Sequence, residues 1–274
     1  MTKAMNHARL FDMPKDIAVV TGACGRLGPV WIQALLEAGA KVMGLDLPDV
    51  PLSQSCLSLQ RDYGDRLLFA RADMTDQRQL QQARLQCEKQ FGSATVLVNN
   101  AGIDQPPDAV TSYTLTEWPV RQINDVLAVN VGGVLATTQV FAESMLQQQK
   151  GSIINIGSLY ARVSPDPRLY DHIACEPPFL KPPAYGASKA ALINLTRYLA
   201  VHWAGQGIRV NSLSPGGVLA NQDVQFQSKY AERVPMGRMA QADDLVGPLV
   251  FLACSASSYL TGQDICVDGG FSLW

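Results

Sequence analysis

The sequence has few of the residues that build metal sites. Its 274 residues include only three histidines, and its six cysteines are scattered without a C-x-x-C pair. Zinc-type sites need such residues at short, regular spacing. We therefore expect no metal ion, and we expect the cysteines to be reduced thiols, as is typical of a cytoplasmic protein.

A basic surface and a membrane-targeting segment are also missing. The net charge is −2 with a pI near 5.9, which makes nucleic acid an unsuitable partner. The N-terminal stretch "MTKAMNHARLFDMPKD" has no apolar core of the kind found in signal peptides. The most apolar window, residues 126–146, contains Asn130, Gln139 and Glu143, and this predicts a buried helix rather than a membrane span. We expect a soluble, cytoplasmic protein that binds a small molecule.

What the sequence does contain is a regular alternation of short β-branched runs and helical stretches. Continuous apolar strands separated by helices are typical of a parallel sheet covered on both faces. The pattern predicts one doubly wound (Rossmann-type) α/β domain, residues 1–274, with about seven strands and a ligand crevice at their carboxyl ends. One long helix is expected over 119–149. The expected strands are 16–22, 41–46, 67–73, 94–102, 151–158, 208–217 and 263–270.

A glycine-rich loop follows the first expected strand. In "VVTGACGRLG", Gly22, Gly25 and Gly28 would let the backbone approach a pyrophosphate at the start of a helix. Asp46 closes the second strand 18 residues after Gly28 (46 − 28), where a carboxylate can bind an adenosine ribose. It would repel a 2′-phosphate, which favours NAD over NADP, whereas Arg26 in the loop could pair with that phosphate.

Ordered motifs along residues 15–270 resemble those of the short-chain dehydrogenase/reductase family. They are "TGACGRLG", "ADMTD", "LVNNAG", "AVNVGG", "INIGS", "YGASK", "VNSLSPGGV" and "GQDICVDGG". The resemblance implies a catalytic tetrad of Asn130, Ser158, Tyr185 and Lys189, and a homo-oligomer, either tetramer or dimer. It also implies cofactor contacts from Gly22, Gly25, Arg26, Leu27, Gly28, Asp46, Asp73, Met74, Asn100, Ala101, Gly102, Tyr185, Lys189, Pro215, Gly216 and Val218.

The chemistry gives the Tyr185 and Lys189 pair a reason. A free phenol, with a pKa of about 10, is a poor base at neutral pH. Four residues apart on a helix, the two side chains share a face. The ammonium, together with the positive nicotinamide ring, can then stabilise a phenolate and lower its pKa. Ser158 would hold the substrate oxygen, and Asn130 would anchor a water that links Lys189 to solvent.

The spacing between Ser158 and Tyr185 is unusually long. The 27 residues (185 − 158) include "SPDPRLYDHIACEPPFLKPP", whose six prolines exclude a helix interior. Residues 159–184 therefore form an inserted loop, which we expect to wall the substrate pocket and to contribute Tyr160, Tyr170 or His172. The alternative is surface packing or a subunit contact.

A second departure follows "SPGGV". Residues 219–236 are expected to form a mobile lid, in which Asn221 and Gln222 replace the usual threonine or face a polar substrate. The two loops resemble those of a bacterial subgroup linked to surface-sugar and sialic-acid-like biosynthesis, which implies an amino-sugar or sugar-phosphate substrate. The basic loop residues that could bind such a phosphate are Arg162, Arg168, Lys181, Lys229 and Arg233.

These features together predict an NAD(H)-dependent oxidoreductase. It would interconvert a secondary alcohol and a ketone, with Tyr185 as general acid/base and a small, sugar-like substrate. A 3-oxoacyl thioester reductase using NADPH is the alternative within the same chemistry. A sugar epimerase or dehydratase, suggested by the glycine spacing, and a non-catalytic dinucleotide-sensing protein are more remote alternatives.

Overall fold

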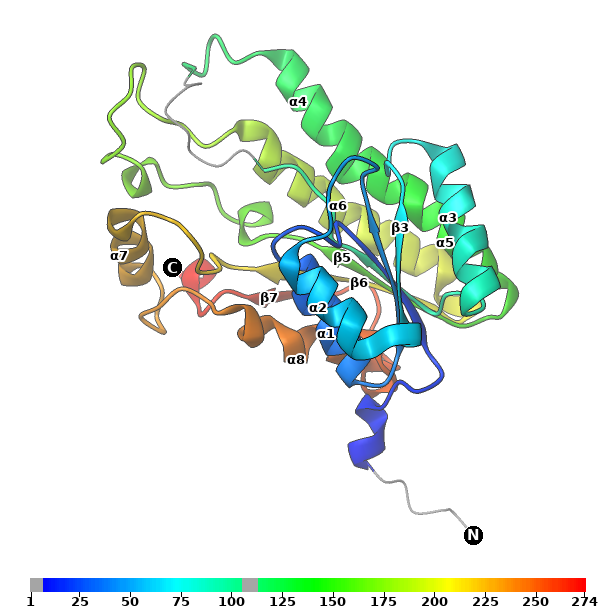
Figure 1. Cartoon of the computed structure of the whole chain (residues 1–274). Coiled ribbons are helices and arrows are strands. Elements are labelled where there is room, and N and C mark those ends of the chain that lie inside the picture. The colour runs from blue at the N-terminus through cyan, green and yellow to red at the C-terminus, as the bar shows by residue number, and fades with distance from the viewer. Residues whose placement is uncertain (1–6, 105–112) are drawn as a thin grey trace.

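The strands form one parallel sheet in a computed structural model that describes residues 7–104 and 113–274. The order across the sheet is β3-β2-β1-β4-β5-β6-β7, so the chain reverses its direction of travel between β1 and β4 (Figure 1). The strands are β1 (Ile17–Thr21), β2 (Lys41–Asp46), β3 (Leu67–Arg71), β4 (Val96–Asn99), β5 (Gly151–Ile156), β6 (Ile208–Pro215) and β7 (Asp264–Val267). The predicted doubly wound α/β fold is confirmed.

Helices cover both faces of this sheet. They are α1 (Gly28–Glu37), α2 (Gln54–Tyr63), α3 (Gln77–Gln90), α4 (Val120–Leu127), α5 (Val134–Gln147), α6 (Pro183–Trp203), α7 (Val224–Glu232) and α8 (Val246–Ala253). The apolar sides of α1, α2 and α8 meet one face in a core that includes Trp31, Leu35 and Leu249. Those of α3, α5 and α6 meet the other, around Phe141 and Leu192. Alternate strand residues therefore face two separate cores, as buried parallel strands require.

The stretch expected as one helix over 119–149 is divided. A π-helical segment, Ala128–Gly133, separates α4 from α5. A π-turn adds one residue to the helical turn and often marks a functional site, and here it contains the buried Asn130. By length and composition Val120–Gln147 could cross a membrane, but α5 packs its Phe141 and Met145 against the sheet, as expected for a core helix.

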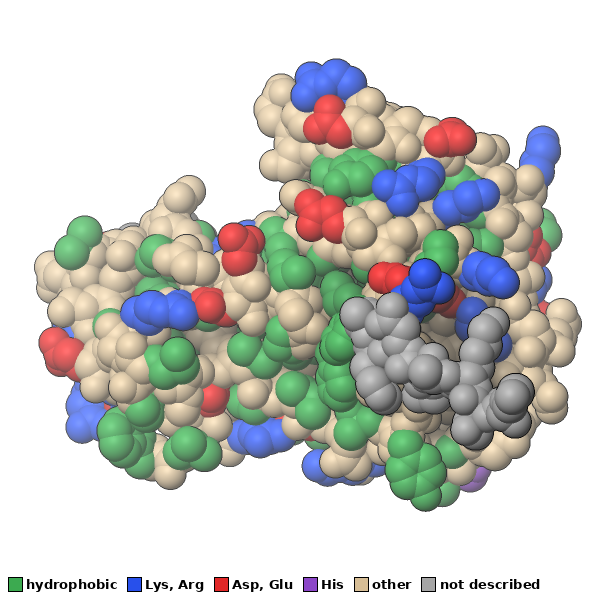
Figure 2. Space-filling view, turned by 90° about the horizontal axis from the view of Figure 1, so that it is seen from below, with side chains coloured by type: hydrophobic (Ala, Val, Ile, Leu, Met, Phe, Trp, Pro, Cys, Tyr) green, Lys and Arg blue, Asp and Glu red, His purple; other side chains and the backbone are tan. Residues whose placement is uncertain are grey.

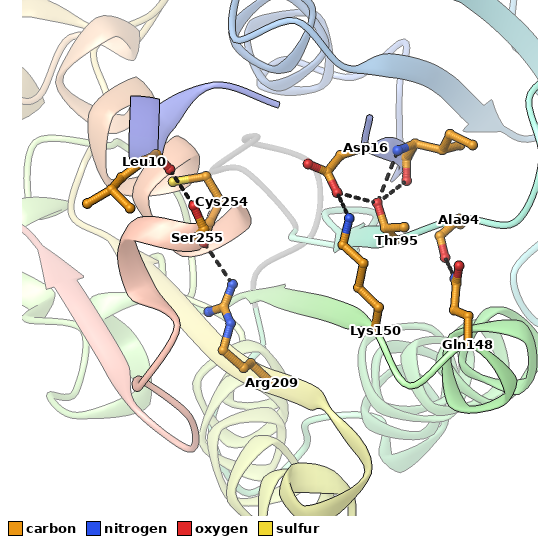
Figure 3. Close-up of polar contacts among 10 residues, drawn as sticks. Leu10, Asp16, Ala94, Thr95, Gln148, Lys150, Arg209, Cys254 and Ser255 are labelled. Atoms are coloured by element: carbon orange, nitrogen blue, oxygen red, sulfur yellow. Dashed lines mark hydrogen bonds and ion pairs between the residues drawn. The ribbon is translucent and has the colours of Figure 1, made fainter. Parts of the chain in front are cut away.

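The amino-terminal edge of the sheet is closed by polar contacts between segments far apart in sequence (Figure 3). Asp16 accepts hydrogen bonds from the Thr95 hydroxyl at 2.9 Å and from Lys150 Nζ at 2.7 Å. On the neighbouring strands, Arg209 donates to the carbonyl of Cys254 at 3.1 Å. These contacts join the beginnings of β1, β4 and β5 to their flanking turns, which leaves the opposite edge for a ligand.

Two excursions from the sheet meet beyond its carboxyl edge. The insert (residues 159–184) and the lid (residues 219–236), which contains α7, share a third apolar core with Phe271 near the C terminus. In Figure 1, α7 accordingly lies beside the chain end and away from the other helices. The insert contains two short 3-10 turns, Leu159–Ala161 and Pro167–Leu169, and ends where Pro183 begins α6.

Charged side chains of both signs are spread over the face shown in Figure 2. Lys and Arg side chains lie among Asp and Glu side chains over the coloured part of this face, without a continuous basic band. This mixed surface agrees with the net charge of −2.

Candidate active site

A cleft of about 1060 Å³ lies at the carboxyl ends of β1, β4, β5 and β6. The glycine-rich loop and the end of β4 form one side of it, and the insert and the lid form the other. This is the position where doubly wound sheets bind ligands. Sixteen of the predicted site residues line it: Gly22, Gly25, Arg26, Leu27, Asn100, Ala101, Gly102, Ser158, Tyr160, Tyr185, Lys189, Pro215, Gly216, Val218, Asn221 and Gln222.

The glycine-rich loop has a shape that only glycine permits at two positions. Gly22 has a φ of +64°, and a Cβ there would lie 2.9 Å from the Ala101 Cα. A Cβ on Gly28 would lie 2.3 Å from the Gly22 carbonyl oxygen. The loop therefore folds tightly against the first turn of α1, where free N–H groups and the helix dipole favour an anion. This cradle fits the pyrophosphate of a dinucleotide.

Asn100 holds this loop against the end of β4. Its side-chain amide donates to the carbonyl oxygens of Thr21 at 2.9 Å and Gly22 at 3.1 Å. Its Oδ1 accepts a hydrogen bond from the Trp31 indole at 2.8 Å. Asn100 thus supports the cradle through the protein, in addition to lining the cleft.

Asp46 lies beside the loop at the end of β2. Its two carboxylate oxygens accept hydrogen bonds from the backbone N–H groups of Cys24 at 2.7 Å and Leu47 at 2.8 Å. The residue paired with it in register on β3 is Arg71, which donates to the Leu47 carbonyl at 3.3 Å. The arginine beside Asp46 is therefore Arg71.

Arg26 lies elsewhere. Its guanidinium donates to the carbonyl oxygen of Val218, across the cleft from the glycine-rich loop. The expectation that Arg26 could pair with a 2′-phosphate next to Asp46 does not match this geometry, because the side chain is directed toward the lid.

Ser158 and Tyr185 meet on the floor of the cleft. Ser158 ends β5 in extended conformation and caps the following turn by accepting from the Tyr160 N–H at 3.2 Å. Tyr185 lies in the first turn of α6 and lines the same cleft as Ser158. Burial raises the pKa of Tyr185 above its ordinary value, the Asp104 carboxylate raises it further, and the Ser158 hydroxyl opposes this rise. The lowered phenol pKa that the sequence predicts depends on the positive nicotinamide ring as well as on Lys189, and it stays a prediction.

Lys189 lies one helical turn beyond Tyr185 and is only 5% exposed. Its Nζ donates to the Ile156 carbonyl at 2.7 Å and lies 5.6 Å from the Tyr185 ring centroid. Burial lowers the pKa of Lys189 to about 8, and the Asp104 carboxylate opposes that shift. Burial therefore destabilises the charged form of Lys189, and a ligand that hydrogen-bonds to the ammonium would stabilise that form.

Five predicted residues do not line the cleft: Gly28, Asp46, Asp73, Met74 and Asn130. Asn130 instead ties two backbone segments together. Its Oδ1 accepts from the Ile103 N–H at 2.7 Å, and its Nδ2 donates to the Ser188 hydroxyl at 3.0 Å. Met74 is 6% exposed, and Asp73 accepts from Thr75 at the end of β3. The water-anchoring role of Asn130 and the cofactor contacts of Asp73 and Met74 stay predictions.

The insert supplies three aromatic side chains to the cleft wall, Tyr160, Tyr170 and His172. Burial raises the pKa of both the Tyr160 and the Tyr170 phenol, so neither is suited to act as a base. His172 Nε2 lies 2.9 Å from the Asp223 carboxylate at the start of α7. The insert is therefore connected to the lid as well as walling the cleft.

Polar contacts hold the lid against the end of β6. The Gln222 side chain accepts from the Ala220 N–H at 2.6 Å and donates to the Val218 carbonyl at 2.9 Å. The Tyr230 hydroxyl accepts a hydrogen bond from the Gly217 N–H. Of the two predicted lid residues, Gln222 thus supports the lid backbone, and Asn221 is exposed at the rim.

The structure adds residues that the sequence patterns did not single out. Asp104 lines the cleft next to Tyr185 and is ion-paired with Lys181. A second hollow of about 490 Å³ lies behind the insert. Tyr160, Tyr170 and Lys181 line both hollows, so one layer of side chains separates them.

Comparison with known proteins agrees with this geometry. Residues 27–272 match a family model described as enoyl-(acyl carrier protein) reductase. The L-tagatose-forming galactitol 2-dehydrogenase of Cereibacter sphaeroides is 31% identical over 276 residues, which are 98% of this chain and 100% of that protein.

Two solved structures are similar along nearly their whole length. A short-chain dehydrogenase from Leptospira borgpetersenii with bound NAD⁺ is 30% identical, with a TM-score of 0.80 over 99% of this chain and 98% of that one. A gluconate 5-dehydrogenase from Burkholderia cenocepacia, in complex with NADP and tartrate, is 28% identical, with a TM-score of 0.83 over 98% and 100%. The cleft is therefore a site for a nicotinamide dinucleotide.

Proposed function

Because the chain belongs to the short-chain dehydrogenase/reductase family, we propose that it oxidises a secondary hydroxyl of a small polyol or sugar with NAD⁺, and reduces the ketone in reverse. The observation that carries this proposal is the placement of Ser158, Tyr185 and Lys189 together at the cleft, with Lys189 Nζ 5.6 Å from the centroid of the Tyr185 ring. Galactitol 2-dehydrogenase, a relative aligned over 98% of this chain and 100% of its own, acts on a polyol by its name.

The carbinol loses two hydrogens, one from its carbon and one from its oxygen, and Tyr185 and Ser158 act at the oxygen. When bound, the nicotinamide supplies the acceptor for the hydride that leaves the carbinol carbon. Tyr185, as phenolate, takes the proton of the hydroxyl while Ser158 donates a hydrogen bond to the same oxygen. The carbon–oxygen bond becomes a carbonyl as the O–H and C–H bonds break. In the reductive direction Tyr185 returns the proton.

Burial opposes the ionisation of Tyr185, so another group must stabilise the phenolate. Burial and Asp104 raise the Tyr185 pKa in the protein alone, so positive charge must be added near the phenol before it can ionise at neutral pH. The Lys189 ammonium, and the oxidised cofactor when bound, are the charges available. Lys189 would also hold the ribose hydroxyls next to the nicotinamide.

We assign NAD as the preferred cofactor. The Asp46 carboxylate is fixed by two backbone N–H groups at the end of β2, where a ribose 2′-hydroxyl can donate to it and a 2′-phosphate would be repelled. Arg71 on the neighbouring strand is the group that could offset this repulsion. Asp46→Ala is expected to narrow the preference for NAD⁺ over NADP⁺, as measured by the ratio of kcat/KM values.

A second candidate is the reduction of a 3-oxoacyl thioester by NADPH. The description of the matching family model names an enoyl-(acyl carrier protein) reductase, which also acts on an acyl thioester, and Arg71 lies beside Asp46. The polar lid residue exposed at the rim, Asn221, suits a hydroxylated substrate better than an acyl chain.

We also propose a cytoplasmic homo-oligomer, either tetramer or dimer. Large apolar side chains are exposed on the outer helices, including Val120 on α4 and Tyr198 and Val201 on α6, at 67%, 62% and 81%. Such side chains on neighbouring helices suit burial by a second copy. Sedimentation or light scattering gives the mass directly.

The proposed reaction is tested with NAD⁺ and NADP⁺ against polyols, sugars, aldonates and hydroxyacyl thioesters, following NAD(P)H absorbance. Tyr185→Phe keeps the ring but removes the proton acceptor, and kcat is expected to fall by about 10³-fold or more, since general acid/base groups contribute about 10²–10⁴-fold. NADH binding should change less than about 3-fold, because the ring packing is kept. Turnover limited to a thioester with NADP⁺ would reject the proposal.

A further inference from the structure

An ion pair outside the predicted tetrad lies beside the Tyr185 phenol. Asp104 follows β4 by five residues, and Lys181 comes from the insert, two residues before α6. Lys181 Nζ lies 2.6 Å and 2.8 Å from the two carboxylate oxygens of Asp104. Both residues line the cleft. The insert thus reaches back across the cleft to the end of β4.

The pair is close enough to the reacting group to touch the same substrate. Lys181 Nζ lies 5.3 Å from the centroid of the Tyr185 ring, close to the 5.6 Å of Lys189. The Asp104 charge raises the pKa values of both Tyr185 and Lys189. A substrate carbon held at Tyr185 therefore has its neighbouring carbon atoms near Asp104 and Lys181.

The two side chains differ in exposure in a way that suits hydroxyl binding. The Lys181 side chain is 7% exposed, whereas the Asp104 side chain is 42% exposed. Each carboxylate oxygen keeps a lone pair after bonding to the ammonium, so two adjacent hydroxyls can donate to Asp104. Lys181 fixes the carboxylate in place and keeps a further N–H for a hydroxyl oxygen.

The charges of the cleft argue against an anionic substrate. Three lysines and arginines line it among the described residues, and each has a partner: Lys181 with Asp104, Lys189 with the Ile156 carbonyl, and Arg26 with the Val218 carbonyl. His172 lies against Asp223. A carboxylate or phosphate next to the reacting carbon would lie against the Asp104 carboxylate and be repelled by it, whereas a neutral polyol would not.

The basic loop residues expected to bind a sugar phosphate are engaged as well. The ion pairs are Arg162 with Asp264, Arg168 and Arg233 with Asp166, Lys181 with Asp104, and Lys229 with Asp171. All five cations of the insert and lid thus face carboxylates of this chain, and the phosphate expectation loses its main support.

We propose that Asp104 and Lys181 bind the hydroxyls next to the reacting carbinol, and that the substrate is a neutral alditol rather than an aldonate or a sugar phosphate. This inference rests on the proposed function and specifies its substrate class. Asp104 is the specificity-determining residue, and Lys181 positions it.

The inference is tested by measuring the oxidation of galactitol, gluconate and 2-butanol, with NAD⁺ as the cofactor, in the wild type and in Asp104→Asn. KM for galactitol is expected to rise by about 30-fold, since hydrogen bonds to a charged group are lost. KM for 2-butanol, which has no second hydroxyl, should change by less than about 3-fold. The matched control is Asp171→Asn, which breaks the Lys229 pair away from the cleft and should leave both values unchanged. Galactitol binding to the enzyme–NADH complex, measured by calorimetry, gives the same comparison where turnover is slow.

Two results overturn the inference while leaving the proposed dehydrogenase intact. One is an equal rise in KM for galactitol and for 2-butanol in Asp104→Asn. This would mean that Asp104 and Lys181 only stabilise the structure of the active site. The other is a wild-type enzyme that prefers gluconate to galactitol, with a preference that grows in Asp104→Asn and is lost in Lys181→Met. That result would mean that Lys181 binds the carboxylate of the substrate. Absence of any alcohol oxidation by the wild type would instead reject the proposed function itself.

Discussion

The glycine-rich loop and the insert–lid pair border the same cleft but are held in place by different forces. The loop is fixed by backbone contact: Gly28 would place a Cβ 2.3 Å from the Gly22 carbonyl oxygen. The insert and lid are fixed by side chains from distant segments, through a small apolar core and several ion pairs. The glycine-rich loop has no space for a larger side chain at Gly28, whereas the insert and the lid are stabilised by many separate contacts.

This difference assigns separate tasks to the two sides of the cleft. A pyrophosphate is the same in every dinucleotide, so a rigid backbone cradle suits it. A substrate differs between enzymes, and side chains on loops can be exchanged without changing the sheet. Single substitutions should therefore have large effects in the loop and small effects in the insert and lid.

Gly28→Ala tests the rigid side and should have the largest effect. The added methyl group meets three backbone atoms of Gly22 and Ala23 at 2.3–2.6 Å, so the loop must move and its N–H groups lose their alignment. We expect NADH affinity to fall by about 1000-fold, measured by fluorescence titration, in line with the cost of overpacking and of lost charge-assisted hydrogen bonds. Gly247→Ala is the control, because no atom lies within 4 Å of its added Cβ. Equal affinities for the two variants would contradict the rigid cradle.

Lys189 lies where the two sides meet, and its burial should be visible in stability. A lysine whose pKa falls from 10.5 to about 8 opposes folding by about 3 kcal/mol while it is charged. Because folding favours the neutral form, this cost is fully present below pH 8 and disappears as the pH rises toward 10.5. Lys189→Met removes the cost, less the lost bond to Ile156, and should be more stable by about 2 kcal/mol at pH 7.

The measurement is urea unfolding of both proteins between pH 7 and pH 10 without cofactor. The other titrating groups are common to both and cancel in the difference. The stability advantage of Lys189→Met should shrink as the pH rises, and a constant difference would show that Lys189 is not the titrating group.

Tyr230→Phe tests the side-chain anchor of the lid and should have an intermediate effect. It removes the hydroxyl that accepts from the Gly217 N–H but keeps the stacking on Phe271, whose ring centroid is 4.8 Å away. One hydrogen bond contributes about 1 kcal/mol, so KM for the alcohol should rise by about 5-fold. Steady-state kinetics with saturating NAD⁺ measures this, and an unchanged KM would mean that the apolar core alone holds the lid.

Lys229→Met tests an exposed ion pair between the lid and the insert and should have the smallest effect. Its partner Asp171 has a 62% exposed side chain, and exposed pairs contribute about 0–1 kcal/mol. The free energy of unfolding should fall by less than about 1 kcal/mol and kcat/KM by less than about 3-fold. A larger loss would show that insert and lid depend on one contact rather than on many.

The rigid side of the cleft was predictable from sequence because its determinants are local. Gly22, Gly28 and Asp46 lie within 25 residues (46 − 22 + 1), and their spacing alone indicates a strand, a turn and a helix. Tyr185 and Lys189 are one turn apart on a helix, so their shared face also followed from spacing. The parallel sheet followed from its continuous apolar strands.

The other side was not predictable because its contacts connect distant segments. The prolines of the insert excluded a helix, but its docking on α7 depends on contacts such as that between the Tyr170 and Phe226 rings, whose centroids are 5.4 Å apart. Asp104 and Lys181 are 77 residues apart, and only the position of an acid just after "NNAG" was available as a signal. The π-turn at Asn130 was missed because the surrounding residues all fit a continuous helix.

The layer formed by Tyr160, Tyr170 and Lys181 has a consequence for the size of molecule that this enzyme could be made to accept. The main cleft and the second hollow lie on either side of these three side chains. Tyr170 belongs to the apolar core, and Lys181 forms an ion pair with Asp104. Of the three side chains, Tyr160 is therefore the one whose replacement by a smaller residue should disturb the structure least. Shortening it would join the two spaces and give a bulkier alcohol a route toward Tyr185, with the dinucleotide side of the molecule left as it is.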